Sequence, residues 1–355
     1  MKGNITMSDS LAPIVAQHYN QIQERGLEER KQSRIFHMRN FNNWVKSMLI
    51  KDFTDKLKGE KNSDFKCVLD IGSGKGGDLL KWKKGGIDYL VCADIAGTSV
   101  EQCQQRYIDM KSRHKRQRER GHCFDAEFIT ADCTRARLKE MYKKAEVQFD
   151  IVSCQFAFHY CFESLPQARK MLQNVSECLK PGGYFIGTLP DAYDIMRRLQ
   201  EASDCTFGND VYSVTFPSKE VPPLFGAKYD FHLEGVVDCP EFLVYFPLFQ
   251  KLAEECELDL LFCKRFEDYF EDRKDTSEGK FLLTRMQVFE TYPPVSKTSL
   301  MGCDDEYYHA KQKIKLLSAE KDVANEEIRV GTLSQSEWEV FSMYVVFAFV
   351  KKKSR

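Results

Sequence analysis

The chain has 355 residues, and its 52 basic side chains almost balance its 53 acidic ones. This balance excludes a strong overall field of either sign, so any contact with nucleic acid has to come from a local basic patch. The 13 cysteines are odd in number and form no C-x-x-C pair, which argues against a disulfide framework or a zinc site. The N-terminus shows no signal-peptide pattern, and the longest apolar runs, such as 343–350, are too short to cross a bilayer. We expect a soluble protein of the cytoplasm or nucleus.

The first 30 residues are polar, and we expect them to be flexible in part and to precede a single domain over 31–355. Between residues 34 and 57 apolar side chains recur at helical spacing, which predicts a helix with one buried face. These side chains are Ile35, Phe36, Met38, Phe41, Trp44, Val45, Met48 and Leu49.

A buried strand followed by a glycine-rich turn is the most informative part of the chain. Residues 67–71 form an apolar run typical of a strand covered on both faces, and the glycines of 72–76 permit a sharp turn and close approach of a ligand. A glycine turn alone is weak evidence for a nucleotide-like cofactor. Asp70, shortly before the first glycine, disfavours a dinucleotide pyrophosphate and favours a cofactor with a cationic end, such as S-adenosylmethionine (SAM).

Two further predicted strands, 89–95 and 126–132, also end in an acid. Asp94 lies about 20 residues beyond the glycine turn, where a carboxylate is placed to bind a ribose hydroxyl pair. Asp132 is placed to hold an adenine amino group. Since Asp is also a favoured cap where a strand turns into a helix, capping remains an alternative, above all for Asp132 taken alone.

Strand and helix patterns alternate up to about residue 200, which predicts an α/β fold with a parallel, doubly wound sheet and ligands at the carboxyl ends of its strands. A period-two pattern then predicts a β-hairpin inserted at about 208–235. The charged, weakly patterned stretch 271–327 is expected to be a surface lobe, partly flexible, and the basic cluster 111–120 is interpreted as a solvated helix end and loop. The other expected elements are helices over 77–84, 98–113, 166–179 and 241–255, a turn over 180–183, and strands over 149–155, 184–188, 211–216, 228–233, 258–262 and 342–351.

Four motifs resemble those of eukaryotic mRNA cap guanine-N7 methyltransferases, most closely the animal nuclear enzymes. They are residues 37–46 (HMRNFNNWVK), 70–82 (DIGSGKGGDLLKW), 154–160 (CQFAFHY) and 240–245 (PEFLVY). The resemblance runs from about 15 to 350 and departs conservatively at Ser73, Ala157 and Phe158. It implies a Rossmann-like SAM-dependent methyltransferase sheet with helices on both faces, a small β-hairpin insertion and a C-terminal lobe.

The resemblance also implies the residues of the site. The SAM pocket would be lined by Lys46, Gly72, Asp94, Asp132, Gln155 and Tyr160. The cap would be contacted by Asn42 and Asn43, by Lys75, Lys81 and Arg106 at its triphosphate, by the ring faces of His159 and Tyr160, by Glu241 at guanine N1 and N2, and by Tyr344, which closes the base pocket. Lysine and arginine hold phosphate oxygens by charge. Without the resemblance, Lys81 and Arg106 would be interpreted as ordinary surface charge.

The reaction that this implies, methylation of guanine N7, requires no general base, because N7 carries a lone pair and no proton. The sequence shows no Cys-His or Ser-His-Asp nucleophile pattern, and no metal is expected. Orientation alone can supply ~7–11 kcal/mol. We therefore expect catalysis by positioning through His159, Tyr160, Glu241 and Tyr344, with S-adenosylhomocysteine as the second product.

Three alternatives remain at this stage: a SAM-dependent methyltransferase of a small molecule or another RNA site, a NAD-linked dehydrogenase, and a SAM-binding RNA module without activity. Asp70 and the G-x-G-K-G-G spacing argue against the dehydrogenase. The expected partners of the capping enzyme are capped RNA and an activating subunit bound to the 271–327 lobe. The expected form is a monomeric catalytic subunit in the nucleus, without membrane contact.

Overall fold

The computed structural model describes residues 10–22, 26, 29, 31–59, 65–117, 122–295, 299–321 and 328–353. The expectations for residues 1–9, 118–120 and 322–327 lie outside the described residues. In the described part, no helix is both long enough and apolar enough to span a membrane.

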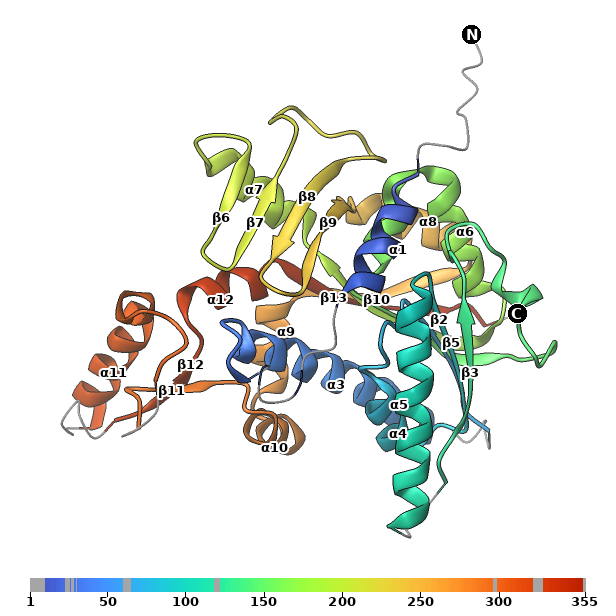
Figure 1. The fold of residues 1–355 in the computed structure, drawn as a ribbon, viewed down its shortest axis with the longest axis horizontal. Coiled ribbons are helices and arrows are strands. Elements are labelled where there is room, and N and C mark those ends of the chain that lie inside the picture. The colour runs from blue at the N-terminus through green and yellow to red at the C-terminus, as the bar shows by residue number, and fades with distance from the viewer. Residues whose placement is uncertain are drawn as a thin grey trace.

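A seven-stranded sheet forms the centre of the molecule, with strand order β10-β13-β5-β4-β1-β2-β3 (Figure 1). The strands β1 to β5 are parallel, as predicted, whereas β13 is antiparallel to both of its neighbours, β5 and β10. Their bounds are β1 Cys67–Ile71, β2 Tyr89–Asp94, β3 Asp125–Thr130, β4 Phe149–Gln155, β5 Leu179–Pro190, β10 Leu258–Arg265 and β13 Tyr344–Lys351.

Helices cover both faces of this sheet, which confirms the doubly wound fold. Because side chains alternate across a strand, Val68 and Leu69 enter two different hydrophobic cores. The helices α3 (Phe36–Gly59), α4 (Leu79–Gly85) and α5 (Gly97–Arg116) cover the Val68 face, and α6 (Leu165–Ser176) and α8 (Phe246–Glu255) cover the Leu69 face. The remaining helices of the main body are α1 Ala12–Gln21, α7 Ala192–Glu201, α9 Phe266–Arg273, α10 Ser277–Arg285 and α12 Gln335–Phe341, with the short 3₁₀ helices η1 Leu138–Glu140 and η2 Phe158–Glu163.

The inserted hairpin is larger than predicted. Its two expected strands are β7 (Tyr212–Thr215) and β8 (Lys228–Leu233), and β6 (Thr206–Asn209) and β9 (Val237–Phe242) complete an antiparallel sheet of order β6-β7-β8-β9. The predicted helix over 241–255 is therefore wrong at its start, because Glu241 belongs to β9 and pairs with Tyr229 of β8. Pro247 lies in the first turn of α8, where proline needs no amide partner, and so the helix begins only at Phe246.

Two smaller differences between the predicted and the observed structure concern single segments. The segment 180–183, expected as a turn, forms the beginning of β5, which runs from Leu179 to Pro190. The N-terminal segment, expected to be polar and flexible in part, carries the helix α1, whose Val15 is buried. Both features depend on contacts with distant parts of the chain, which a local pattern does not contain.

The region expected as a charged surface lobe contains ordered elements. Its first part, α10, packs against α3, and the indole nitrogen of Trp44 donates to the carbonyl of Gly279 at 3.0 Å. The part farther along the chain, which we call the distal lobe, comprises β11 Glu290–Tyr292, η3 Asp304–Tyr307, α11 Tyr308–Lys321 and β12 Val330–Thr332. It has its own small core of Tyr292, Tyr307, Ala310 and Ile314.

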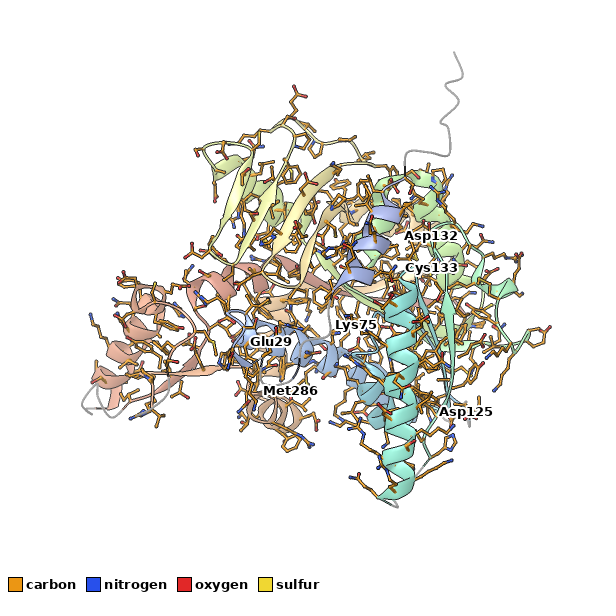
Figure 2. All side chains as sticks on the ribbon, in the orientation of Figure 1. Glu29, Lys75, Asp125, Asp132, Cys133 and Met286 are labelled. Atoms are coloured by element: carbon orange, nitrogen blue, oxygen red, sulfur yellow. The ribbon has the colours of Figure 1, made fainter. Side chains whose placement is uncertain are left out.

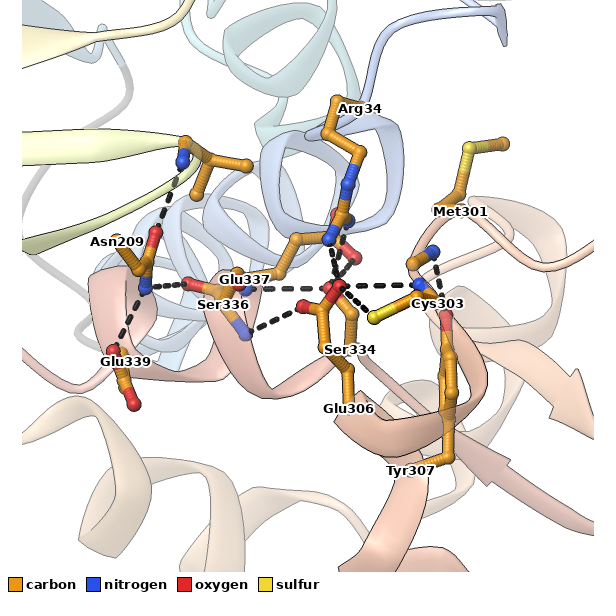
Figure 3. Close-up of polar contacts among 12 residues, drawn as sticks. Arg34, Asn209, Met301, Cys303, Glu306, Tyr307, Ser334, Ser336, Glu337 and Glu339 are labelled. Carbon is orange, nitrogen blue, oxygen red and sulfur yellow. Dashed lines mark hydrogen bonds and ion pairs between the residues drawn. The ribbon is translucent and has the colours of Figure 1, made fainter.

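The distal lobe is joined to the main body by a polar network around Glu306 (Figure 3). The carboxylate of Glu306 forms an ion pair with Arg34 and accepts the amide hydrogen of Ser336 at 3.1 Å. Arg34 also donates to the hydroxyl of Ser334 at 3.0 Å, and Ser334 donates to Glu337 at 3.0 Å. A few charge-assisted contacts therefore hold this lobe in place.

Candidate functional site

A cavity of about 480 Å³ opens at the carboxyl ends of β1, β2, β3 and β4. Its wall contains Gly72, Asp94, Asp132 and Gln155, one from the end of each of these strands, as well as Lys46 from α3. This edge of a doubly wound sheet is where such folds bind ligands. The predicted SAM residues, Tyr160 included, all line this one cavity.

The first residue of the glycine turn lies close to the segment that follows β4. Gly72 has φ +70°, and a Cβ atom there would lie 2.5 Å from the Cβ atom of Ala157. Gly74 and Gly76 also have positive φ, which glycine adopts at least cost. At Gly72 and Gly74 the turn therefore presents backbone rather than a side chain to the cavity.

Asp94 holds this turn against β2. One carboxylate oxygen accepts the amide hydrogen of Gly74 at 2.8 Å and the other accepts that of Ala96 at 2.9 Å. Burial raises the pKa of Asp94, and the two amide hydrogen bonds oppose that rise. Each carboxylate oxygen can accept a second hydrogen bond, so both remain able to bind a hydroxyl pair.

The surroundings of Asp132 bear on the two interpretations that its sequence position allowed, capping and cofactor binding. Its Oδ1 atom accepts the amide hydrogen of Thr134 at 2.9 Å and the Thr134 hydroxyl at 2.6 Å, which is a capping arrangement. The residue also lines the cavity, and Figure 2 shows it at the end of α5 that is nearest to α1. The structure is therefore compatible with both the capping and the binding interpretation.

Gln155 offers an unused acceptor to the cavity. Its amide nitrogen donates to the hydroxyl of Ser153 at 3.2 Å, whereas its Oε1 atom is buried and has no hydrogen-bond partner among the described residues. A buried polar atom without a partner is costly, so it marks a place where a ligand donor fits. Together with the exposed glycine backbone, this fits a nucleoside-like cofactor.

The helix α1 closes one side of the cavity, which the sequence interpretation missed. Leu11, Val15 and Tyr19 line the cavity from a single face at a spacing of four residues. The hydroxyl oxygens of Tyr19 and Tyr160 are 3.0 Å apart, and the Tyr160 hydroxyl lies 3.5 Å from the sulfur of Cys239. Burial raises the pKa of both tyrosines, so their hydroxyls stay protonated. The spacing of these apolar residues is the signal that would have identified the helix.

A buried charge cluster lies behind the glycine turn. Asp78 forms ion pairs with Lys46 at 2.9 Å and with Lys81 at 2.6 Å. Burial alone would raise the pKa of Asp78, but the two ammonium groups outweigh it and hold that pKa well below its ordinary value. Burial, with the charge of Asp78, raises the pKa of Asp70 to about 7. The carboxylate of Asp70 accepts a hydrogen bond from the indole nitrogen of Trp82 at 3.3 Å, and Asp70 is not part of the cavity wall. This position does not support the expected contact between Asp70 and the cationic end of SAM.

The lysines expected at a triphosphate have different surroundings. The ammonium of Lys81 donates to Asp78, to the carbonyl of Gly77 and to the side chain of Asn43, and Lys81 lies outside the cavity wall. Lys75 lines the cavity, and its ammonium donates to the carbonyl of Ile22 at 2.6 Å. The alternative interpretation of Lys81 as ordinary surface charge does not fit, since its side chain is only 11% exposed and forms an ion pair with Asp78.

Only some of the remaining residues expected to contact the cap belong to the cavity wall. Asn43 and Arg106 line it, whereas Asn42 does not. The amide nitrogen of Asn42 contacts the sulfur of Met38 at 3.2 Å, and its buried oxygen has no hydrogen-bond partner among the described residues.

His159, Glu241 and Tyr344 come together directly beside the cavity. His159 Nε2 and Glu241 Oε1 are 3.4 Å apart, and the hydroxyl of Tyr229 donates to Glu241 Oε2 at 2.7 Å. The ring of Tyr344 packs edge to face on Phe156, which belongs to the cavity wall. His159, Glu241 and Tyr344 are all buried, and none of them is part of the cavity wall.

Phe156 is a second residue that the sequence interpretation missed. It has φ +57°, in the left-handed region that a bulky side chain rarely adopts. Such strain at a site is maintained by the surrounding structure. Its ring lines the cavity and packs edge to face on Tyr344, so it connects the cavity wall with the buried group of His159, Glu241 and Tyr344.

Within the described residues, no cluster of three or more His, Cys, Asp or Glu side chains could hold a metal ion.

The sheet with its antiparallel β13, the glycine turn and the cavity at the carboxyl edge define a Rossmann-like methyltransferase fold. Residues 4–352 match the family profile of the mRNA (guanine-N(7))-methyltransferase domain. The chain therefore belongs to the mRNA (guanine-N7)-methyltransferase family.

Individual relatives agree with this assignment. The chain is 49% identical over 345 residues to the mRNA cap guanine-N(7) methyltransferase of Drosophila melanogaster, covering 96% of this chain and 77% of that protein. It is 43% identical over 346 residues to the enzyme of the same name from Caenorhabditis elegans, covering 96% and 87%. Among solved structures, a methyltransferase from Streptomyces caelestis matches with a TM-score of 0.45 and 11% identity, covering 87% of this chain and 96% of that one.

Proposed function

We propose that the protein transfers the methyl group of SAM to N7 of the guanosine that caps mRNA, converting GpppN-RNA to its m7G form. The observation that carries the proposal is that the predicted cofactor residues share one cavity and that three of the predicted base-pocket residues meet directly beside it. When bound, SAM supplies an electrophilic methyl group and leaves as S-adenosylhomocysteine.

The cofactor would be held by Lys46, Gly72, Asp94, Asp132, Gln155 and Tyr160. Asp94 would accept the ribose hydroxyls, for which its two oxygens have capacity, and Gln155 would accept a hydrogen bond through its unused oxygen. Tyr19 and Tyr160 would exclude water from one side.

The cap would be recognised on the other side of Phe156. Glu241 would accept hydrogen bonds from guanine N1 and N2, between the flat faces of His159 and Tyr344. Asn43, Lys75 and Arg106 line the cavity and would contact the triphosphate side, with Asn42 behind them. Lys81 would act through Asn43, whose side-chain oxygen accepts from the Lys81 ammonium at 3.2 Å.

Positioning would supply the rate enhancement. Guanine N7 already carries its lone pair, so no side chain has to remove a proton. Positive charge moves onto the base during transfer, and the carboxylate of Glu241 would favour that movement from a buried position. The remaining contribution comes from alignment of the two reactants.

The test is a single-turnover assay with SAM and GpppG-capped RNA, with uncapped triphosphate RNA as the control substrate. We expect N7 methylation of the capped RNA alone.

With both substrates saturating, the rate should be nearly flat from about pH 6.5 to 9, because no base titrates in the transfer step. Glu241→Gln should slow the transfer step, whereas Tyr229→Phe, which keeps the carboxylate and removes one hydrogen-bond donor to it, should slow it less. Methylation of a small molecule in place of capped RNA would contradict the proposal.

We further propose that the protein acts in the nucleus as a monomeric catalytic subunit and that an activating subunit binds the distal lobe. The capping reaction and the family of the chain support the nuclear role. The distal lobe supports the binding of an activating subunit, because it protrudes from the main body with Tyr308 and Leu316 exposed (Figure 1).

A further inference from the structure

The helix α5 extends from the cavity to a basic end that the proposed function does not use. Ser99 and Arg106 line the cavity from this helix, seven residues apart. Arg113 follows at the same spacing, and seven residues are almost two complete turns, so these three residues lie on one side of the helix. Figure 1 shows α5 running past α4 and projecting beyond it.

The basic side chains at the far end are exposed. The last turn of α5 contains Arg113, His114, Lys115 and Arg116. Arg113 continues the line of Arg106 within about 20°, and Arg116 lies about 80° around the helix from it, so both exposed side chains lie within one quarter of the helix surface. The same side carries Asp109, whose carboxylate accepts from Gln105 at 3.0 Å. Lys111 is directed elsewhere, because its ammonium contacts Asp125 at 2.9 Å and the Tyr107 hydroxyl at 3.1 Å. We call Arg106, Arg113 and Arg116 the α5 basic stripe.

A simpler explanation accounts for only part of this arrangement. Basic residues in the last turn of a helix favourably complement its dipole, which would suffice for Arg113 and Arg116. It does not explain Arg106, which lies in the middle of α5 and faces the cavity. The whole chain has a net charge of −1, so the stripe is a local positive feature of an otherwise balanced molecule.

We propose that the α5 basic stripe binds the RNA strand that follows the cap. This inference rests on the proposed function, since the cap triphosphate would place the start of that strand at Arg106. From Arg106 to Arg116 the helix rises about 15 Å, which matches about four phosphates of a stacked strand. The stripe would contact phosphates without reading bases, so it would hold RNA of any sequence.

The test compares the double variant Arg113→Gln, Arg116→Gln with the unaltered full chain. Glutamine removes both charges without placing a carboxylate at the helix end. The substrates are GpppG and a capped RNA of about 20 nucleotides, which share the cap and differ only in the strand that reaches the stripe. The matched control is Arg169→Gln, Lys251→Gln, which removes two exposed helical charges on α6 and α8.

For the double variant we expect the KM for the long RNA to be about tenfold higher. The slope of the logarithm of its binding constant against the logarithm of salt concentration should be about 1.4 smaller in magnitude, the value for two lost phosphate contacts on a single strand. KM and kcat for GpppG should stay unchanged, and the control should behave as the unaltered chain. An unchanged KM for the long RNA would overturn the proposal, and so would an equal loss with GpppG or in the control. Failure of the unaltered chain to methylate GpppG would instead contradict the proposed function.

Discussion

Asp94 fastens the glycine turn to β2, because its carboxylate accepts amide hydrogens from both Gly74 and Ala96. Asp94→Asn replaces one of these acceptors by a donor and removes the charge. We expect SAM affinity to fall about 10- to 100-fold, the value of a hydrogen bond to a charged group, as measured by titration calorimetry. Asp88→Asn is the matched control, since Asp88 accepts the amide hydrogen of Lys66 at 2.8 Å. Equal SAM affinity in a folded Asp94 variant would contradict the assignment.

Glu337 predicts a pH dependence of stability. Burial raises its pKa to about 7, against the hydrogen bonds from Met38 and Ser334 that lower it. A carboxyl whose pKa is raised on folding stabilises the protein below its unfolded pKa of about 4.5, and this contribution is lost as the pH rises through about 7.

Glu337→Gln cannot ionise and should escape this loss. Its free energy of unfolding relative to the unaltered chain should therefore increase by about 3 kcal/mol between pH 4.5 and 8, as measured by urea unfolding at both pH values. A difference that is the same at both pH values would mean that folding does not raise the pKa of Glu337.

At this scale the sequence predicted residues whose roles follow from strand ends and motifs, and it missed those whose roles depend on neighbours. Gly72, Asp94 and Gln155 lie at strand ends, so alternation of elements brings them to one edge. The burial of Lys81 beside Asp78 depends on the packing of α3 against α4, which no local pattern contains.

The helix α1 precedes the central sheet in the sequence and forms part of the cavity wall. Val15 is buried at 6% exposure, whereas its neighbour Ile14 is 50% exposed. Val15→Asp would place an unpaired carboxylate in an apolar contact, which is costly, and should displace α1 from the cavity wall.

We expect Val15→Asp to lower SAM affinity at least about tenfold and to speed hydrogen exchange over 12–21, with the central sheet unaffected. Ile14→Asp should leave both properties unchanged. Similar behaviour of the two variants would mean that α1 does not form part of the binding site.

Elements with one clear period were predictable, and elements made by long-range pairing were not. The helix α3 was recognised from eight apolar residues at helical spacing. The last two residues of β9, Glu241 and Phe242, were predicted as the start of a helix, because their strand character comes from pairing with β8 rather than from their own pattern.

For the whole molecule, the distal lobe and the main body should differ in stability. Among its described residues the lobe has a small buried core of Tyr292, Tyr307, Ala310 and Ile314, and Glu306 ties it to Arg34 and Ser336 of the body. We expect the amides of α11 to exchange with solvent faster than those of β1 and β4.

Glu306→Gln should accelerate exchange in α11 without changing β1 and β4. The control is Asp304→Asn, which removes a charge that contacts Lys311 inside the same lobe. Exchange of α11 as slow as that of the central strands would show that the lobe is an integral part of the main body.

The overall architecture was the most predictable level. Alternating strands and helices imply a parallel sheet with helices on both faces, because each strand must be covered twice. The position of β13 between β5 and β10 was not predictable, since a final apolar strand can join a sheet at several places.

That position has a consequence for how the protein is made. A ribosome releases β10 long before β13, and in the seven-stranded sheet the neighbour of β10 is β13. Tyr344, the first residue of β13, also belongs to the proposed guanosine pocket beside Glu241. A nascent chain that has not yet exposed β13 therefore contains the strands of the cofactor cavity but not the complete guanosine pocket. Synthesis of β13, rather than folding of the first five strands, would then be the step that completes the proposed guanosine pocket.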